Sequence, residues 1–180
     1  MPVHQGVHSH IGPNWNMPWD FDVYIGSYCS ISQNVTAIGA DHNMAFPSTR
    51  HFDDCGGIIG AAFEPYPIHN HGPLIIMNDV WVGYNAILMS GSLLGNGCVI
   101  GAGSTVAGKI PPYAVAVGNP ARVIKYRFTP DQIASLERIR WWAWPEEKIV
   151  YNKHRFLSTD IDDFLEVHDA EYKRSNSVVQ

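Results

Sequence analysis

The stretch LLGNGCVIGAGSTVAG, residues 93–108, places an aliphatic residue at every sixth position. Leu94, Ile100 and Val106 mark this period, and a glycine or an alanine directly follows each of them. An α-helix has a period near 3.6 residues and a strand a period of 2, so neither explains the pattern. A fixed internal period predicts a solenoid, here of short strands and tight turns, in which each unit buries its apolar edge against the next.

The period extends backwards and forms two columns of residues. The first column is aliphatic, and the second, four positions later in each unit, is mostly small, as expected for side chains in a narrow interior. An earlier block with Ile25 and Ile31 has the same spacing. Residues 41–73 between the two blocks lack it, and we expect them to form one long excursion. The first column is Ile76, Val82, Leu88, Leu94, Ile100 and Val106, and the second is Val80, Ala86, Ser92, Cys98, Ser104 and Ile110.

The domain plan follows from where the period starts and stops. Residues 1–24 show no period and are expected to be irregular, and 25–125 are expected to form a β-helix, with three units per turn and the excursion 41–73. Residues 126–174 are expected to form a C-terminal α-helical cap. In that segment Thr129 is a predicted N-cap, Pro130 takes the first helical position and Gln132 completes a capping box.

Composition limits the classes of protein that fit this chain. With 180 residues and 46% hydrophobic residues, the chain suits one domain, and its net charge of -5 argues against a dedicated nucleic-acid binder. It has no apolar run long enough for a membrane span and no secretory leader pattern, so we expect a cytoplasmic protein. Of three cysteines, Cys29 and Cys98 occupy interior columns, and Cys55 lies in the excursion. Buried free thiols are therefore expected rather than disulfides.

Three segments carry a resemblance to a known family: NDVWVGYNAILMSG (78–91), IPPYAVAVGNPARVIKYRF (110–128) and RWWAWP (140–145). The chain resembles the xenobiotic acetyltransferase branch of the hexapeptide-repeat acyltransferases, which includes type B chloramphenicol and streptogramin acetyltransferases. The resemblance implies an all-β solenoid coiled as a left-handed parallel β-helix. It also implies acetyl transfer from acetyl-coenzyme A, without a metal, to a hydroxyl or amine of an antibiotic or a bacterial sugar. Homotrimers with active sites between subunits are expected.

The catalytic base that the resemblance implies lies at the start of the excursion. The segment ADHNMAFPSTRHF (40–52) places His42 in the family's catalytic position. A histidine suits the removal of a proton from an acceptor hydroxyl because its ordinary pKa lies near neutrality. His51 is a rival base on the same segment. The group that would orient the His42 ring stays open among Asp41, Asp53 and a backbone carbonyl.

Small residues at the turns are expected to bind coenzyme A. Its pantetheine arm can pair with main-chain groups only where the side chains are small enough to leave the backbone accessible. The resemblance also implies two cations that meet the nucleotide phosphates and a tryptophan beside the pantetheine arm or the acceptor. The predicted coenzyme-binding residues are Trp81, Gly83, Tyr84, Ala102, Ala107, Arg122 and Lys125.

Two other functions are compatible with a hexapeptide β-helix. The first is a catalytically inactive scaffold, which the presence of His42 and of the cationic tail argues against. The second is a γ-class carbonic anhydrase, whose two repeat-borne histidine ligands would fall near Tyr84 and Met89, and neither is a histidine. The pair His69 and His71 has metal-ligand spacing, but a solvated or acceptor-facing role fits it better, and no metal site is expected.

Overall fold

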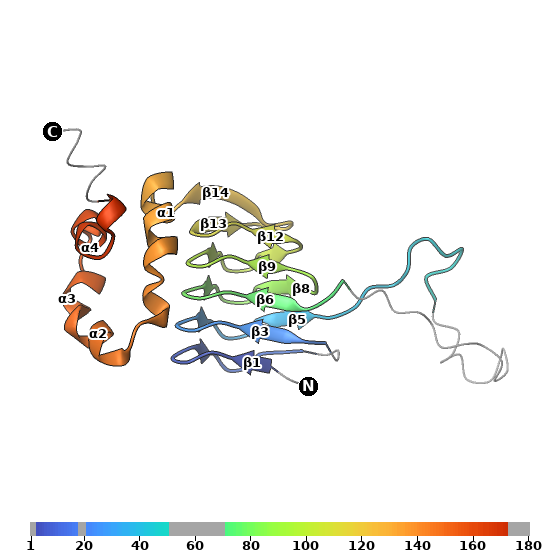
Figure 1. Ribbon diagram of the computed structural model, residues 1–180. Coiled ribbons are helices and arrows are strands. Elements are labelled where there is room, and N and C mark those ends of the chain that lie inside the picture. Colours follow the sequence, from blue (N-terminus) through green and yellow to red (C-terminus); the bar gives the residue numbers. More distant parts are fainter. Residues whose placement is uncertain (1–2, 18–20, 51–70, 173–180) are drawn as a thin grey trace.

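A computed structural model describes residues 3–17, 21–50 and 71–172 of the chain. The described residues form a stack of coils, with a group of helices along one side and a projecting arm on the opposite side (Figure 1). Three sheets make the walls of the stack, and all strand pairs in them are parallel except the last, where β14 runs antiparallel to β13. The expected solenoid of short parallel strands is therefore present.

Each wall takes one short strand from successive coils. Sheet 1 contains β1 (Val3–Gln5), β3 (Val23–Ile25), β6 (Leu74–Ile76), β9 (Leu93–Leu94) and β12 (Lys109–Ile110). Sheet 2 contains β2 (His10–Ile11), β4 (Ser30–Ile31), β7 (Trp81–Val82), β10 (Val99–Ile100), β13 (Ala114–Val117) and β14 (Arg122–Tyr126). Sheet 3 contains β5 (Thr36–Ile38), β8 (Ile87–Met89) and β11 (Thr105–Val106).

The pairing register shows how the excursion is inserted. Trp81 pairs with Val99, 18 positions later, so three six-residue units make one coil. Trp81 also pairs with Ser30, 51 positions earlier, which is one coil plus 33 residues. The stretch 41–73 has that length. The coil therefore continues in register across the excursion, which leaves after β5 and returns before β6.

The N-terminal segment corrects the expectation of irregular structure in 1–24. Strand β1 pairs with β3 and β2 pairs with β4, so these residues form the first coil of the stack. Two features hide the period there. Val3 pairs with Val23, 20 positions later instead of 18, and Gln5 takes the register position that the buried Ile25 has in the next coil.

Both predicted columns lie in the interior. Every residue of the first column is at most 1% exposed, and the second column ranges from fully buried to 7% exposed at Ile110. Cys29 and Cys98 are buried free thiols, as expected, while Cys55 lies outside the described residues. Burial is the main cause that raises the pKa of Cys98 to about 12, which keeps this thiol protonated and unreactive.

Tight turns between the sheets form three edges along the stack. The helix edge joins sheets 1 and 2, the asparagine edge joins sheets 2 and 3, and the arm edge joins sheets 3 and 1. Many turn residues have positive φ, which asparagine and glycine adopt at low cost. The helix edge has His8, Tyr28, Asp79, Gly97 and Tyr113, the asparagine edge has Asn14, Asn34, Asn85 and Gly103, and the arm edge has Gly91 and Gly108.

The C-terminal helices lie beside the stack and do not cover its end (Figure 1). The Trp141 ring packs 5.0 Å from the Tyr28 ring of the second coil, and Asn96 Nδ2 donates to Glu137 at 3.2 Å. The expectation that residues 126–174 cap the end of the β-helix is therefore corrected. Their helices pack along the helix edge, on the side of the stack. The segment contains α1 (Pro130–Ile139), η1 (Trp141–Ala143), α2 (Glu146–Tyr151), α3 (Lys153–Phe156) and α4 (Ile161–His168).

The signals for the start of α1 are confirmed. Thr129 accepts a hydrogen bond from the Gln132 N–H, Gln132 completes the capping box, and Pro130 is the first helical residue. The helix ends at Ile139, and its C-cap residue Arg140 has a left-handed φ of 46°. No helix within the described residues is long and apolar enough to cross a bilayer.

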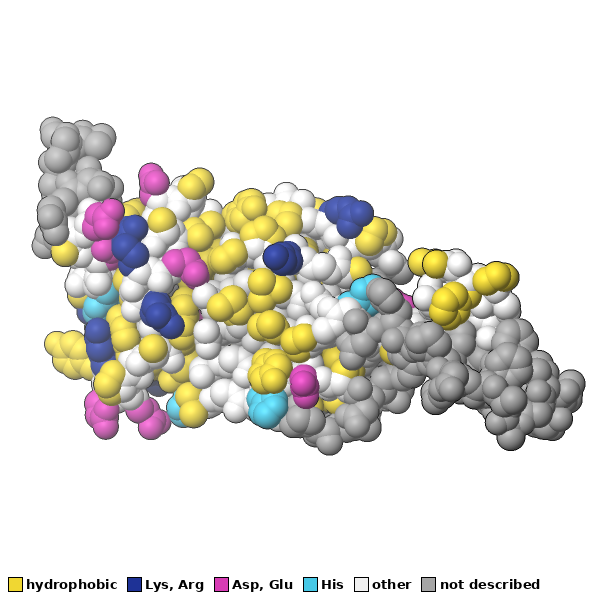
Figure 2. Space-filling view, turned by 45° about the vertical axis from the view of Figure 1, so that its right-hand side comes forward, with side chains coloured by type: hydrophobic (Ala, Val, Ile, Leu, Met, Phe, Trp, Pro, Cys, Tyr) yellow, Lys and Arg dark blue, Asp and Glu magenta, His cyan; other side chains and the backbone are white. Residues whose placement is uncertain are grey.

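Large apolar side chains remain exposed on the outer faces of the coils. Tyr24, Ile75 and Met77 of the sheet 1 side are 41%, 37% and 36% exposed, and Trp81 of sheet 2 is 55% exposed. Figure 2 shows hydrophobic side chains gathered over the middle of the stack on the face in view, with few charged side chains among them. Gathered apolar side chains on a surface are typical of a face that another protein covers.

Candidate functional site

His42 lies on the arm that leaves the stack after β5, and its side chain is exposed. The arm extends away from the coils, on the side opposite the helices (Figure 1). His42 Nδ1 lies 2.5 Å from the backbone carbonyl oxygen of Thr49. A carbonyl oxygen only accepts hydrogen bonds, so Nδ1 carries the hydrogen and Nε2 of the neutral ring keeps its lone pair. Of the orienting groups left open by the sequence, a backbone carbonyl is therefore in contact with the ring, and Asp53 lies outside the described residues.

The two ends of the arm are held together at the arm edge. The Asp41 carboxylate lies 3.1 Å from His71 Nε2, so this aspartate contacts His71 across the neck of the arm. The Ser90 N–H donates to the Ile38 carbonyl, and the Gly91 N–H donates to the Gly72 carbonyl. One turn of the third coil thus anchors both ends of the arm. His51, Asp53 and His69 lie outside the described residues.

The predicted phosphate-binding cations lie on β14, at one end of sheet 2. The register places Lys125 opposite Val115, Val115 opposite Val99, and Val99 opposite Trp81. Lys125 therefore lies in the same cross-strand column as Trp81, three strands away, which corresponds to roughly 14 Å. Arg122 pairs with Val117 at the asparagine-edge end of this strand, and its side chain is exposed.

Gly83 and Ala102 lie on successive coils of the asparagine edge. A Cβ added at Gly83 would approach the Ala102 nitrogen to 2.6 Å, so the close stacking of the two coils requires a glycine. The Gly83 N–H itself donates to the Ile100 carbonyl and is used inside the stack. Ala102 is exposed, and its N–H has no acceptor among the described residues. Ala102, rather than Gly83, offers a main-chain donor to a ligand.

Tyr84 projects from the asparagine edge and is 49% exposed. The Asn14 side chain donates to Asn34 at 2.9 Å, and Asn34 donates to the Tyr84 hydroxyl at 2.8 Å. Because this hydroxyl accepts from Asn34, its own hydrogen can be donated elsewhere. A ladder of turn side chains from three coils thus fixes the position of the tyrosine.

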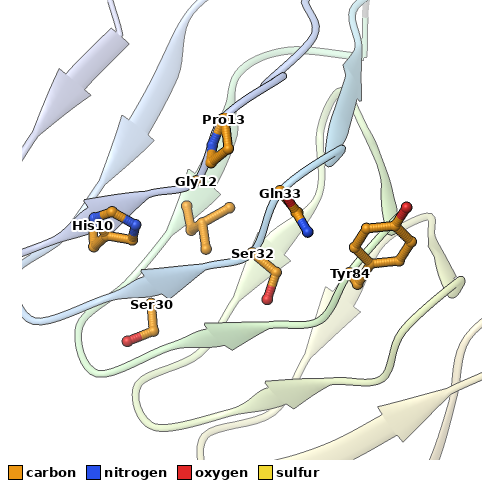
Figure 3. A pocket seen from close by; sticks show the side chains of 8 residues that line it. His10, Gly12, Pro13, Ser30, Ser32, Gln33 and Tyr84 are labelled. Atoms are coloured by element: carbon orange, nitrogen blue, oxygen red, sulfur yellow. The ribbon is translucent and has the colours of Figure 1, made fainter.

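A groove of about 370 Å³ lies next to Tyr84, on the first and second coils (Figure 3). Sequence reasoning did not identify it, because its residues belong to separate coils. The sequence offers one local signal, the polar turn Ser32, Gln33 and Asn34. The groove is lined by His10, Gly12, Pro13, Ser30, Ile31, Ser32, Gln33 and Tyr84.

The predicted residues divide between two edges of the chain. Trp81, Gly83, Tyr84, Ala102, Arg122 and Lys125 lie on sheet 2 or at the asparagine edge. Ala107 lies at the arm edge, between β11 and β12, and His42 lies beyond that edge on the arm. A single chain therefore does not bring His42 together with the six residues of sheet 2 and the asparagine edge. Within the described residues, no three His, Cys, Asp or Glu side chains are grouped so that they could hold a metal.

Comparison with known proteins identifies the family. Residues 73–108 match the family model for the bacterial transferase hexapeptide (six repeats). A probable macrolide acetyltransferase of Lysinibacillus sphaericus is 38% identical over 133 residues, which span 71% of this chain and 73% of that protein. A chloramphenicol acetyltransferase of Agrobacterium fabrum is 39% identical over 131 residues, which span 69% of this chain and 61% of that protein.

Among solved structures, the polySia-specific acetyltransferase NeuO is 32% identical, with a TM-score of 0.53 over 70% of this chain and 48% of that chain. The chain therefore belongs to the hexapeptide-repeat acetyltransferases, in the xenobiotic branch that includes the chloramphenicol and macrolide enzymes. Its class is that of the acetyltransferases that use acetyl-coenzyme A, and its parallel coils are the hexapeptide β-helix of this family.

Proposed function

We propose that the protein transfers an acetyl group from acetyl-coenzyme A to a hydroxyl or amine of a small acceptor, with His42 as the general base. The single observation that carries the assignment of the base is the contact between His42 Nδ1 and the Thr49 carbonyl. This contact holds the ring in the tautomer whose Nε2 can accept a proton.

The reaction needs such a base because a neutral hydroxyl is a poor nucleophile. As the acceptor oxygen attacks the thioester carbonyl, its proton passes to His42 Nε2. The tetrahedral intermediate then collapses, the carbon–sulfur bond breaks, and the coenzyme thiolate takes the proton from the imidazolium. General-base catalysis of this kind contributes about 10²–10⁴ in rate.

Coenzyme binding is assigned to sheet 2 and the asparagine edge. Arg122 and Lys125 would meet the nucleotide phosphates by charge-assisted hydrogen bonds, and the Ala102 N–H would donate to an amide of the pantetheine arm. Trp81, more than half exposed, would pack against that arm. Gly83 supports the site by allowing the coils to stack closely.

The site is proposed to form between subunits of a homotrimer. His42 projects from the arm edge, whereas most of the coenzyme residues lie at the asparagine edge. A trimer would let the arm of one subunit reach the asparagine edge of the next, and its interfaces would cover apolar residues that one chain leaves exposed, such as Ile75 and Met77. In that arrangement Ala107 and His42 of one subunit face the coenzyme held by another.

The experiment that tests this function measures thiol release from acetyl-coenzyme A. Wild type, His42→Ala and His154→Ala are compared with chloramphenicol, a macrolide, a streptogramin and amino sugars as acceptors. His154, exposed on α3, is the matched histidine control. Loss of turnover by at least a hundredfold in His42→Ala alone, with coenzyme binding retained, supports the assignment. Turnover in His42→Ala equal to wild type would refute His42 as the base, and a wild type that binds no coenzyme A would refute the function.

A further inference from the structure

A cavity of about 480 Å³ lies between the stack and the C-terminal helices. This volume falls within the range of roughly 300–1,000 Å³ that is typical of small-molecule sites. Asp79 and Tyr113 of the helix edge form one wall, and Trp141, Arg155 and Phe156 of the helical segment contribute to the other. The helical segment lies on the side of the stack opposite the arm (Figure 1), so this cavity is remote from His42.

The Tyr113 hydroxyl is a buried polar group in the wall of this cavity. The residue is 1% exposed, and its hydroxyl forms no hydrogen bond with any of the described residues. Burial raises the pKa of this hydroxyl above its ordinary value, so the group keeps its hydrogen and can donate. A buried donor without an acceptor is costly, and an acceptor on a ligand in the cavity would remove that cost.

Two guanidinium groups of the lining also keep unused donors. Arg127 Nη1 donates to the Asp79 carboxylate at 3.2 Å and to the Gly97 carbonyl at 2.7 Å, while its Nη2 has no acceptor among the described residues. Arg155 uses Nε, which donates to Asp163 at 2.9 Å. The lining holds two arginines and one aspartate, and that aspartate is already paired. The available groups therefore favour a ligand that accepts hydrogen bonds and carries a negative charge.

Most of the remaining lining is aromatic. The Trp141 and Phe156 rings lie 5.0 Å apart, and the Phe156 and Phe164 rings lie 5.2 Å apart, so the three form one connected aromatic surface. Phe128 adds a fourth ring beside Arg127. A flat ring packs well against such a surface, which buries its apolar faces and its edges.

We propose that this cavity binds a small planar aromatic molecule that carries one carboxylate group. The ring would pack against Trp141, Phe156 and Phe164. The carboxylate would accept hydrogen bonds from the Tyr113 hydroxyl and from Arg127, whose guanidinium lies 5.5 Å from the centre of the Tyr113 ring. The inference is independent of the proposed function, because none of the lining residues was assigned to coenzyme binding or to catalysis.

The test compares three ligands that share an indole ring and differ in the charge of the side group. Indole-3-acetate, indole-3-acetamide and tryptamine are titrated into the wild-type protein by isothermal titration calorimetry. We expect indole-3-acetate to bind at least tenfold more tightly than the neutral amide, because hydrogen bonds to a charged acceptor are stronger, and the cationic tryptamine to bind most weakly. Tightest binding of the amide or of tryptamine would overturn the proposal, as would absence of indole-3-acetate binding.

Tyr113→Phe removes the hydroxyl and leaves the shape of the cavity unchanged. The dissociation constant for indole-3-acetate should rise about 3–10-fold, as for one lost hydrogen bond. Without ligand, the variant should unfold at the same temperature as wild type or higher, since the hydroxyl has no partner to lose. Tyr151→Phe is the matched control, because Tyr151 is 78% exposed on α2 and lies outside the cavity. Equal effects of the two substitutions on binding would overturn the proposal.

Asp79→Asn tests the charge of the site. Replacing the carboxylate that pairs with Arg127 frees the guanidinium, so indole-3-acetate should bind about 3–10-fold more tightly while indole-3-acetamide is nearly unaffected. Weaker binding of indole-3-acetate in this variant, with the protein still folded in thermal unfolding, would contradict the role of Arg127. Saturating coenzyme A should leave all these constants unchanged, and competition would instead place the indole at the coenzyme site and overturn the proposal.

Discussion

The Asp41 carboxylate and His71 Nε2 are 3.1 Å apart and join the two ends of the arm that carries His42. Asp41 directly precedes His42 in the chain, so this contact determines where the histidine leaves the stack. Both side chains are nearly half exposed, at 45% and 44%, so the pair adds little stability, within about 1 kcal/mol. Its effect is on the position of the arm.

Breaking this contact should therefore lower turnover more than stability. Asp41→Ala and His71→Ala are each expected to reduce kcat by about 5–10-fold, because a small misplacement of a catalytic group is costly, while KM for acetyl-coenzyme A is unchanged. Since the two residues act as a pair, the double variant should be no slower than either single variant. Asp163→Asn, which breaks the exposed contact with Arg155, is the control. Independent, multiplicative losses would contradict the pairing.

Removing the β14 cations should weaken coenzyme binding. Arg122→Ala combined with Lys125→Ala is expected to raise KM for acetyl-coenzyme A at least tenfold with little change in kcat, because phosphate contacts act equally in the ground and transition states. The wild-type KM should rise with salt, and the variant should lose most of that dependence. Lys109→Ala, an exposed lysine on sheet 1, is the control. An unchanged KM in the double variant would show that the phosphates bind elsewhere.

Adding one methyl group at Gly83 should destabilise the stack. The new Cβ would lie 2.6 Å from the Ala102 nitrogen, so two coils must separate, at a cost of about 1–3 kcal/mol. Gly103→Ala meets no atom within 4 Å but keeps a φ of 68°, so it should cost only about 1 kcal/mol. Urea unfolding of wild type and both variants measures the loss in free energy of unfolding that each substitution causes. A smaller loss in Gly83→Ala than in Gly103→Ala would contradict the close-stacking argument.

The helical segment should lose stability in acid through Asp169. Burial by itself raises the pKa of this carboxyl, but hydrogen bonds from Arg138 and Ser135, each 2.6 Å at the shortest, outweigh it and hold the pKa below its ordinary value. The stabilisation is fully present above about pH 4, the ordinary pKa, and is lost as pH falls through the lower folded-state value. Chemical unfolding between pH 2 and 7 should show this loss in wild type and a weaker one in Asp169→Asn. Equal pH profiles would exclude Asp169 as its source.

The six-residue period was sufficient to predict the coil, because the buried positions recur at a fixed spacing along the chain. Ile100 and Cys98 were recognised as interior residues, and the length of the excursion agrees with the pairing register. Thr129 marked the first helix because a capping box is a local interaction. The first coil was missed, since Gln5 takes an inward register position and the spacing there is 20 residues.

Only the tertiary structure decided how the candidate site is distributed. The contact of His42 with the Thr49 carbonyl depends on how the arm folds back, and the pairing of Asp41 with His71 depends on where the arm returns to the stack. The groove joins residues such as His10, Gln33 and Tyr84, which are far apart in sequence and adjacent only because coils stack. A periodic sequence determines which residues face inward, whereas neighbours on the outer surface are set by the register between coils.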